Sequence, residues 1–231
     1  MKKKIINWIR QVLRETKAKG VVLGVSGGVD SAVVASLCTM ALGRKRVLAL
    51  ILPCHSNKDD AYYAKKVIKK LGIRYKYIDL SGVYDKLVSL LPKTNKLALS
   101  NLKPRLRMMA LYYFANSFNY LVVGTGNRSE LTVGYFTKYG DGGVDILPIG
   151  RLLKCQVYRL AKELDVPKEI ISRTPTAGLW AGQTDEGEMG ITYKKLDKIL
   201  KQYNNIKKIP NKKVRKMAVD ALHKLSPPLL P

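Results

Sequence analysis

The chain has 231 residues, 46% of them apolar, which suits one globular domain over residues 1–231. No apolar run approaches the roughly 20 residues of a membrane span, which argues against a membrane protein. The three cysteines form no CxxC pair, which argues against a disulfide framework and a familiar zinc site. The formal net charge of +25 leaves three explanations open: a nucleic acid partner, a polyanionic small substrate or a lysine-rich proteome.

Apolar periodicity predicts helices and buried strands that alternate along the first half of the chain. The first element is an amphipathic helix with its apolar face over residues 5–13. In chain order there follow a strand at 21–25, a helix at 31–42, a strand at 46–52, a helix at 57–71, a strand at 74–80, helices at 83–91 and 103–118, and a strand at 120–124. The stretch 125–150 is rich in Gly, Asp and Thr, and helices return at 154–164, 192–203 and 214–225.

Strands separated by helices predict βαβ units, and therefore an α/β fold with a doubly wound parallel sheet. We expect about five strands, with helices on both faces of the sheet. Ligands bind such a sheet at the carboxyl ends of its strands. The turns after residues 25, 52 and 123 should therefore meet at one edge, which places Ser26 beside Thr125.

A glycine-rich turn follows the first expected strand and reads Gly24-Val25-Ser26-Gly27-Gly28-Val29-Asp30-Ser31. Consecutive glycines let the backbone approach a ligand closely, and the following helix N-terminus offers N–H groups to an anion. Two serine hydroxyls add donors, and Asp30 could hold Mg²⁺ against phosphates. The turn is neither a Walker A loop nor a GxGxxG fingerprint. The alternative is an ordinary capped strand-to-helix turn, but the full string is specific enough to favour a phosphate-binding loop.

This string resembles the loop of the ATP pyrophosphatase superfamily, whose members leave pyrophosphate on the loop while AMP is transferred to a substrate. The superfamily includes amide-forming synthetases and tRNA-modifying enzymes, so the loop does not choose between them. Further strings resemble the NAD⁺ synthetase family, in the family's order and over most of residues 24–197. They lie at residues 101–108, 124–130, 134–145 (Gly-Tyr-Phe-Thr-Lys-Tyr-Gly-Asp-Gly-Gly-Val-Asp), 148–154, 174–176 and 183–186.

The resemblance implies a two-step amide synthesis. ATP first adenylates the carboxylate of deamido-NAD⁺ (nicotinic acid adenine dinucleotide) and releases pyrophosphate, and ammonia then displaces AMP to give NAD⁺. A carboxylate is a poor electrophile at neutral pH, and AMP turns its oxygen into a leaving group. Catalysis then rests on positioning and on neutralising phosphate charge, with Mg²⁺ as Lewis acid and template.

The resemblance also implies roles for individual residues. Asp30, Glu130 and Lys154 match catalytic positions, and Asp30 and Glu130 match the Mg²⁺ ligands. The ATP-binding positions are the loop Gly24, Val25, Ser26, Gly27, Gly28, Val29, Asp30 and Ser31, together with Thr125, Lys154 and Thr176. The positions that bind deamido-NAD⁺ are Arg105, Lys138, Asp145, His223 and Lys224.

Several of these residues also have a purely structural interpretation. Glu130 could stabilise the first turn of a helix that Asn127 caps. Residues 141–145 could form only a tight turn, since Asp and Gly are favoured there. The His223-Lys224 match is two residues long, and a surface helix end would explain it as well.

The charged N-terminus and the lack of a membrane span indicate a cytoplasmic protein, and the resemblance implies a homodimer. Only about 20 residues precede the first strand, which leaves no room for the glutaminase domain of the family's longer form, so we expect the use of free ammonia. Residues 50–55 are apolar where some relatives have an arginine before Leu-Pro. One alternative function is a tRNA-modifying enzyme on the same loop, which the charge favours. It would need an RNA-binding appendage, which the sequence does not show, so we do not expect a nucleic acid partner. A non-catalytic nucleotide-binding module is a second alternative, which the two acidic residues oppose.

Overall fold

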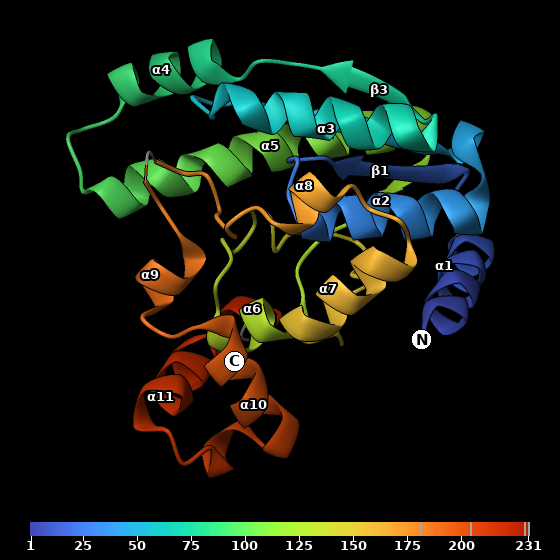
Figure 1. Ribbon diagram of the computed structural model, residues 1–231. Coiled ribbons are helices and arrows are strands. Elements are labelled where there is room, and N and C mark those ends of the chain that lie inside the picture. The colour runs from blue at the N-terminus through green and yellow to red at the C-terminus, as the bar shows by residue number, and fades with distance from the viewer. Residues whose placement is uncertain (181, 204, 229, 231) are drawn as a thin grey trace.

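Four parallel strands form one sheet in the computed structural model, which describes residues 1–180, 182–203, 205–228 and 230 (Figure 1). The strands are β1 (Gly20–Gly24), β2 (Val47–Ile51), β3 (Arg74–Tyr77) and β4 (Tyr120–Val122), in the spatial order β3-β2-β1-β4. The α/β fold class is as predicted, but the expectation of about five strands is wrong for the described residues. On the side of β4 away from β1, the described residues form only an isolated bridge between Val123 and Ile146. Pro148 follows and has no N–H to extend the pairing.

Helices cover both faces of the sheet (Figure 1). On one face lie α1 (Lys2–Thr16), α2 (Val29–Leu42), α3 (Lys58–Leu71) and α7 (Lys154–Glu163). On the other face lie α4 (Ser81–Leu90) and α5 (Lys96–Phe118). Strand side chains alternate between the two cores, so Val21 and Leu23 pack with the first set of helices and Val22 with the second. This is the doubly wound arrangement that the sequence predicts.

Helices from the second half of the chain build a third hydrophobic cluster beyond the end of the sheet (Figure 1). They are α6 (Arg128–Val133), α9 (Asp185–Met189), α10 (Tyr193–Gln202), the 3-10 turn η2 (Ile206–Lys208) and α11 (Lys212–Asp220). Leu196, Leu200, Ile209 and Val214 form its interior, and Leu153 ties it to the start of α7. Three short elements complete the chain: η1 (Arg44–Arg46), α8 (Lys168–Ile171) and α12 (Leu222–Leu225).

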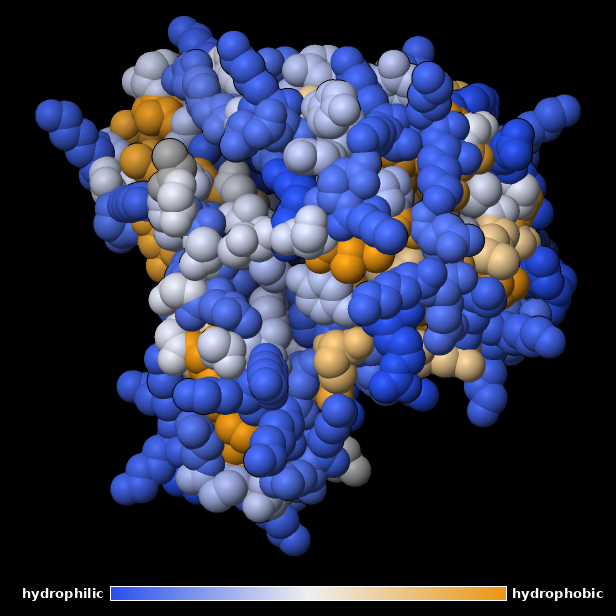
Figure 2. Space-filling model, in the orientation of Figure 1, coloured by the Kyte–Doolittle hydropathy of each residue, from blue (hydrophilic) through white to orange (hydrophobic). Residues whose placement is uncertain are grey.

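Most predicted helices are found, but α5 begins earlier than predicted. Its start at Lys96 follows Asn95, whose side chain accepts a hydrogen bond from the N–H of Ala98. Pro104 lies inside this helix rather than at its start. Figure 2 shows mainly hydrophilic side chains on one face of the molecule, with apolar ones in small groups. None of the helices that the structure describes is long and apolar enough to cross a membrane.

Candidate active site

The glycine-rich turn joins the end of β1 to the start of α2. Ser31 donates from Oγ to the carbonyl of Gly28 (2.9 Å) and accepts from the N–H of Ser26 (3.3 Å), which closes the turn on itself. Gly27 has φ +81°, and a Cβ there would lie 2.6 Å from the carbonyl oxygen of Asp60. Glycine is therefore required at this position both for its backbone angle and for its close contact with α3.

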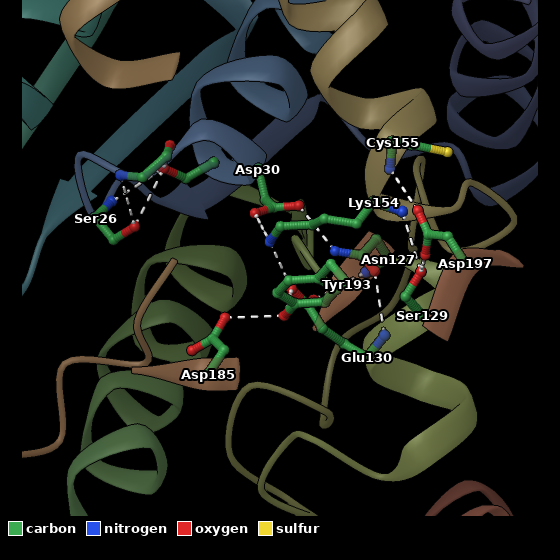
Figure 3. A network of polar contacts seen from close by, with 12 residues as sticks. Ser26, Asp30, Asn127, Ser129, Glu130, Lys154, Cys155, Asp185, Tyr193 and Asp197 are labelled. Carbon is green, nitrogen blue, oxygen red and sulfur yellow. Dashed lines mark hydrogen bonds and ion pairs between the residues drawn. The ribbon is translucent and has the colours of Figure 1, made fainter. Parts of the chain in front are cut away.

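An ion-pair triad lies at the end of this turn (Figure 3). Lys154 Nζ is 2.7 Å from Asp30 Oδ2 and 2.9 Å from Glu130 Oε1. The three residues come from the first turns of α2, α6 and α7, so three helix N-termini converge on one point. The Lys154 side chain is only 3% exposed, whereas those of Asp30 and Glu130 are 18% and 14% exposed. The carboxylates thus remain open toward solvent or a ligand.

Asn127 fixes the two carboxylates in place. Its Nδ2 donates to Asp30 Oδ1 (2.9 Å), and its Oδ1 accepts from the N–H of Glu130 (3.1 Å). Glu130 Oε2 accepts in turn from the N–H of Asn127, which completes a capping box. The helix-capping interpretation of Glu130 is therefore correct, and it is compatible with a second role because Oε1 still points to Lys154.

Burial and charge act against each other in this triad. Burial raises the pKa of Glu130 to about 7, opposed by the nearby Lys154 and reinforced by Asp30. Burial also opposes the charge on Lys154, but the two carboxylates outweigh it and raise the pKa of this ammonium group. Lys154 therefore stays charged at neutral pH, and it balances two acidic side chains with a single positive charge.

A second layer of residues from α9 and α10 supports the triad, and sequence reasoning missed it. The Tyr193 hydroxyl lies 3.1 Å from Glu130 Oε1 and 2.9 Å from Asp185 Oδ2. Lys154 Nζ also lies 4.7 Å from the centre of the Tyr193 ring. The sequence shows only an acidic stretch at residues 184–188 in an otherwise basic chain. Thr184 caps α9, and Asp185 reaches the site.

A cavity of about 550 Å³ opens at the carboxyl ends of the strands beside this triad. Most predicted ATP-binding residues line it, which agrees with the expectation that Ser26 and Thr125 share one edge. The predicted residues on its wall are Gly24, Val25, Ser26, Gly28, Val29, Asp30, Ser31, Thr125, Glu130, Lys154, Thr176 and Lys224. Gly27 is buried beneath the turn instead.

The predicted dinucleotide-binding residues lie elsewhere, apart from Lys224. Arg105 donates from Nε to the carbonyl of Lys138 (3.3 Å), and Lys138 Nζ donates to the carbonyl of His223 (2.6 Å), so these three residues share one surface region. Asp145 accepts hydrogen bonds from the Tyr112 hydroxyl (2.9 Å) and from a backbone N–H of β4 (2.7 Å). None of these four predicted residues lines the cavity.

An arginine from α5 lies at the strand end where the sequence lacks one. Arg107 donates from Nε to the carbonyl of Leu52 (3.0 Å) and from a terminal nitrogen to Ser56 Oγ (3.1 Å). It also lines the cavity. The apolar stretch at 50–55 therefore does not leave this edge without a cation, because a different element provides one.

The segment from Arg173 to Trp180 crosses the cavity wall and carries Thr176. Arg173 anchors its beginning with hydrogen bonds to the carbonyl of Gly27 (3.0 Å) and to Asp60 (2.6 Å). Lys103 anchors its end through the carbonyl of Leu179 (2.7 Å). These contacts tie the segment to the glycine-rich turn, to α3 and to α5.

Comparison with known proteins decides the family of this chain. A family model described as NAD synthase matches residues 1–228. The chain belongs to the NAD synthase family. It is 52% identical over 202 residues to an NH(3)-dependent NAD(+) synthetase of Carboxydothermus hydrogenoformans, which covers 85% of this chain and 83% of that protein. It is 50% identical over 216 residues to the corresponding protein of Archaeoglobus fulgidus, covering 93% and 87%.

Solved structures agree with the NAD synthase assignment. The fold is similar to that of an NMN synthetase from Francisella tularensis, with a TM-score of 0.92 and 40% identity over 100% of this chain and 96% of that one. It is also similar to an NH3-dependent NAD synthetase from Campylobacter jejuni, with a TM-score of 0.81 and 31% identity over 100% and 97%. The strings that the sequence identified therefore belong to a whole-chain similarity.

Proposed function

We propose that this NAD synthase family member is an NH₃-dependent NAD⁺ synthetase, an amide-forming ligase that uses ATP as co-substrate. The proposal draws on the family and on relatives at about 50% identity over most of the chain. Within the structure, the observation that carries it is the position of Lys154 between Asp30 and Glu130 at the mouth of the glycine-rich turn. This arrangement offers a cation for phosphates and two acids for a metal at a single point.

ATP would place its phosphates over the glycine-rich turn. The N-terminus of α2 has no side-chain cap, so its first N–H groups and its positive dipole end are available to an anion. Ser26 is exposed beside them, and Thr125 and Thr176 line the same cavity. Lys154 would then exchange part of its contact with the carboxylates for contact with a phosphate oxygen.

Asp30 and Glu130 fit a magnesium ion that phosphates help to bind. No group of three or more His, Cys, Asp or Glu suited to a metal occurs in the part of the chain that the structure describes. Mg²⁺ commonly takes only one or two carboxylates from the protein, with phosphates and water as the other ligands. The two partly exposed carboxylates match this requirement, and the bound ion would neutralise charge on the phosphates.

The reaction depends more on how the substrates are positioned than on a reactive side chain of the protein. The substrate carboxylate attacks the α-phosphorus of ATP, a C–O–P link forms, and pyrophosphate leaves. Ammonia next attacks the carbonyl carbon, the new C–N bond forms, and the C–O bond to AMP breaks. Lys154, the α2 N-terminus and the loop hydroxyls would hold the phosphates in line and stabilise the developing charge.

Arg105, Lys138 and His223 form a separate candidate contact for the part of deamido-NAD⁺ that extends beyond the cavity. Hydrogen bonds connect these three residues at the surface. Lys224, which follows His223 in the sequence, lines the cavity wall. A site this open would be completed by a second copy of the chain, so we propose a homodimer built from single-domain subunits of residues 1–231. Light scattering at micromolar concentration tests this, and a monomer would count against it.

One assay tests the proposed reaction. The protein is incubated with ATP, Mg²⁺, ammonium and deamido-NAD⁺, and NAD⁺, AMP and pyrophosphate are measured together. Equal amounts of the three products are expected, and glutamine in place of ammonium should give no NAD⁺. Product formation from glutamine equal to that from ammonium would refute ammonia dependence. A lack of turnover with any pyridine nucleotide would favour a tRNA substrate instead.

A second candidate reaction is the amidation of nicotinic acid mononucleotide to NMN. The similarity to an NMN synthetase, with a TM-score of 0.92, favours it. So does the position of Arg105, Lys138 and His223 outside the cavity, since a mononucleotide would not need them. Parallel measurements of kcat/KM with deamido-NAD⁺ and with nicotinic acid mononucleotide choose between the two substrates. We expect the dinucleotide to be preferred, because the relatives at 52% and 50% identity are NAD⁺ synthetases.

A further inference from the structure

One oxygen of a buried carboxylate on the cavity wall lacks a donor. Asp185, the first residue of α9, is only 5% exposed and lines the cavity. Its Oδ2 accepts from the Tyr193 hydroxyl at 2.9 Å, but its Oδ1 has no hydrogen-bond partner within the described residues (Figure 3). It is the one buried side-chain oxygen or nitrogen of those residues in this condition. Buried polar atoms are normally paired, so an unpaired oxygen at a cavity points to a ligand.

The surroundings of Asp185 restrict what that ligand can be. Tyr193 joins Asp185 to Glu130, and Glu188 lies nearby, where it already accepts from Tyr135 (2.9 Å) and Gln183 (2.6 Å). On this wall of the cavity the carboxylates of Asp185, Glu130 and Glu188 outnumber the lysines that interact with them, Lys154 and Lys224, whereas the chain as a whole carries a net charge of +25. A phosphate or carboxylate group of a substrate would be repelled here. The free oxygen calls for a small ligand that donates N–H bonds and carries positive charge.

We propose that Asp185 Oδ1 binds the ammonium ion, which loses one proton to solvent so that the resulting ammonia, with its free lone pair, can supply nitrogen for the amidation. The inference rests on the proposed function and adds the position of its smallest substrate. Ammonia in neutral solution is mostly protonated to ammonium. The four N–H groups of ammonium point in tetrahedral directions, so one of them can donate to an oxygen in almost any orientation of the ion. A strongly basic protein repels this cation in general, so a local acidic wall is needed to concentrate it. The site would hold the nitrogen in the same cavity as the loop that binds ATP.

The test separates the two half-reactions in D185N. Pyrophosphate release without ammonium reports adenylation, and NAD⁺ formation against ammonium concentration reports amidation. The matched control is E186Q, which removes the same charge from the same helix. Glu186 accepts from the backbone N–H of Tyr193 and does not line the cavity. The asparagine is isosteric and relieves a buried charge, so D185N should fold and be at least as stable as the wild type.

In D185N we expect the KM for ammonium to rise about tenfold or more, because a hydrogen bond to a charged group is lost. Pyrophosphate release should stay within about twofold of the wild type, and E186Q should change neither value by more than that. An unchanged KM for ammonium would overturn the inference. An equal loss of both half-reactions would also overturn it, because it would assign Asp185 to ATP or the metal. An unfolded variant would overturn it too, because it would show that Oδ1 has a structural partner. A wild-type protein without turnover would refute the proposed function itself.

Discussion

The backbone N–H of Cys155 donates to Asp197 Oδ2 at 2.7 Å, which joins the first turn of α7 to α10. The second oxygen of Asp197 accepts from Ser129 Oγ at 2.5 Å, and Ser129 accepts in turn from the N–H of Lys154 (3.0 Å). Asp197 is only 3% exposed. One buried carboxylate thus positions the starts of α6 and α7, and with them Glu130 and Lys154.

Replacement of Asp197 by alanine should destabilise the protein by about 1–3 kcal/mol per donor left unpaired. Both orphaned donors, Ser129 and the N–H of Cys155, lie at helix starts that hold the site. Urea unfolding measures the effect. E163Q is the control, because Glu163 is an exposed residue at the end of the same helix α7, and it should change stability by less than about 0.5 kcal/mol. Equal stability of D197A and the wild type would contradict the positioning role.

Lys154 should matter for folding as well as for activity. K154M would leave the partly exposed carboxylates of Asp30 and Glu130 without their cation, which should cost about 1–3 kcal/mol. We expect a clear fall in the denaturant midpoint at neutral pH, together with a loss of turnover. If the variant were as stable as the wild type, the two carboxylates would have to be solvated in the absence of ligand.

Asp30 should behave differently, because its removal leaves Lys154 paired with Glu130. D30A should fold nearly normally yet lose roughly 10²-fold or more in turnover, as the loss of a transition-state charge stabiliser does. Circular dichroism and steady-state kinetics at saturating Mg²⁺ check the two halves of this prediction. Near-normal turnover would remove Asp30 from the metal site.

Sequence reasoning placed the loop side of the site well because two local rules determine it. Apolar runs locate the strands, and the carboxyl-end rule brings the turns after β1 and β4 together. Thr125 and Ser26 accordingly line one cavity. Asp30 was proposed from its place in the loop, and Glu130 and Lys154 only through family resemblance; the structure places Lys154 within hydrogen-bonding distance of both carboxylates.

The parts that escaped prediction depend on tertiary contacts. Asp197 and Tyr193 lie in an amphipathic helix whose pattern shows which face is apolar but not what it packs against. Arg107 takes its place at the end of β2 only because α5 crosses that face of the sheet. The start of α5 was placed at residue 103, too late, because the capping residue Asn95 begins the helix at Lys96. A polar pattern alone did not distinguish an unpaired carboxylate such as Asp185 from a solvated one.

Gly27 and Gly82 offer a paired test of backbone constraint. In G27A the new Cβ would lie 2.6 Å from a backbone oxygen of α3 at φ +81°, so we expect a loss of more than about 1 kcal/mol and a loss of turnover. Gly82 is the second residue of α4, with open space where a Cβ would lie, and G82A should instead stabilise by about 0.4–1 kcal/mol. Thermal unfolding of both variants checks the opposite signs. Tolerance of alanine at position 27 would mean that the turn can move away from α3.

The three cysteines should differ in reactivity. Cys38 is fully buried and burial raises its pKa to about 12, so its thiolate is essentially absent under native conditions. Cys54 is also buried, and burial raises its pKa. Cys155 is the exposed thiol, although burial of its sulfur raises its pKa as well. A chromogenic thiol reagent at mildly alkaline pH should therefore label one thiol in the native protein and three after unfolding. The variant C155S should remove the native signal, and persistent labelling in that variant would show that one of the two buried sites opens in solution.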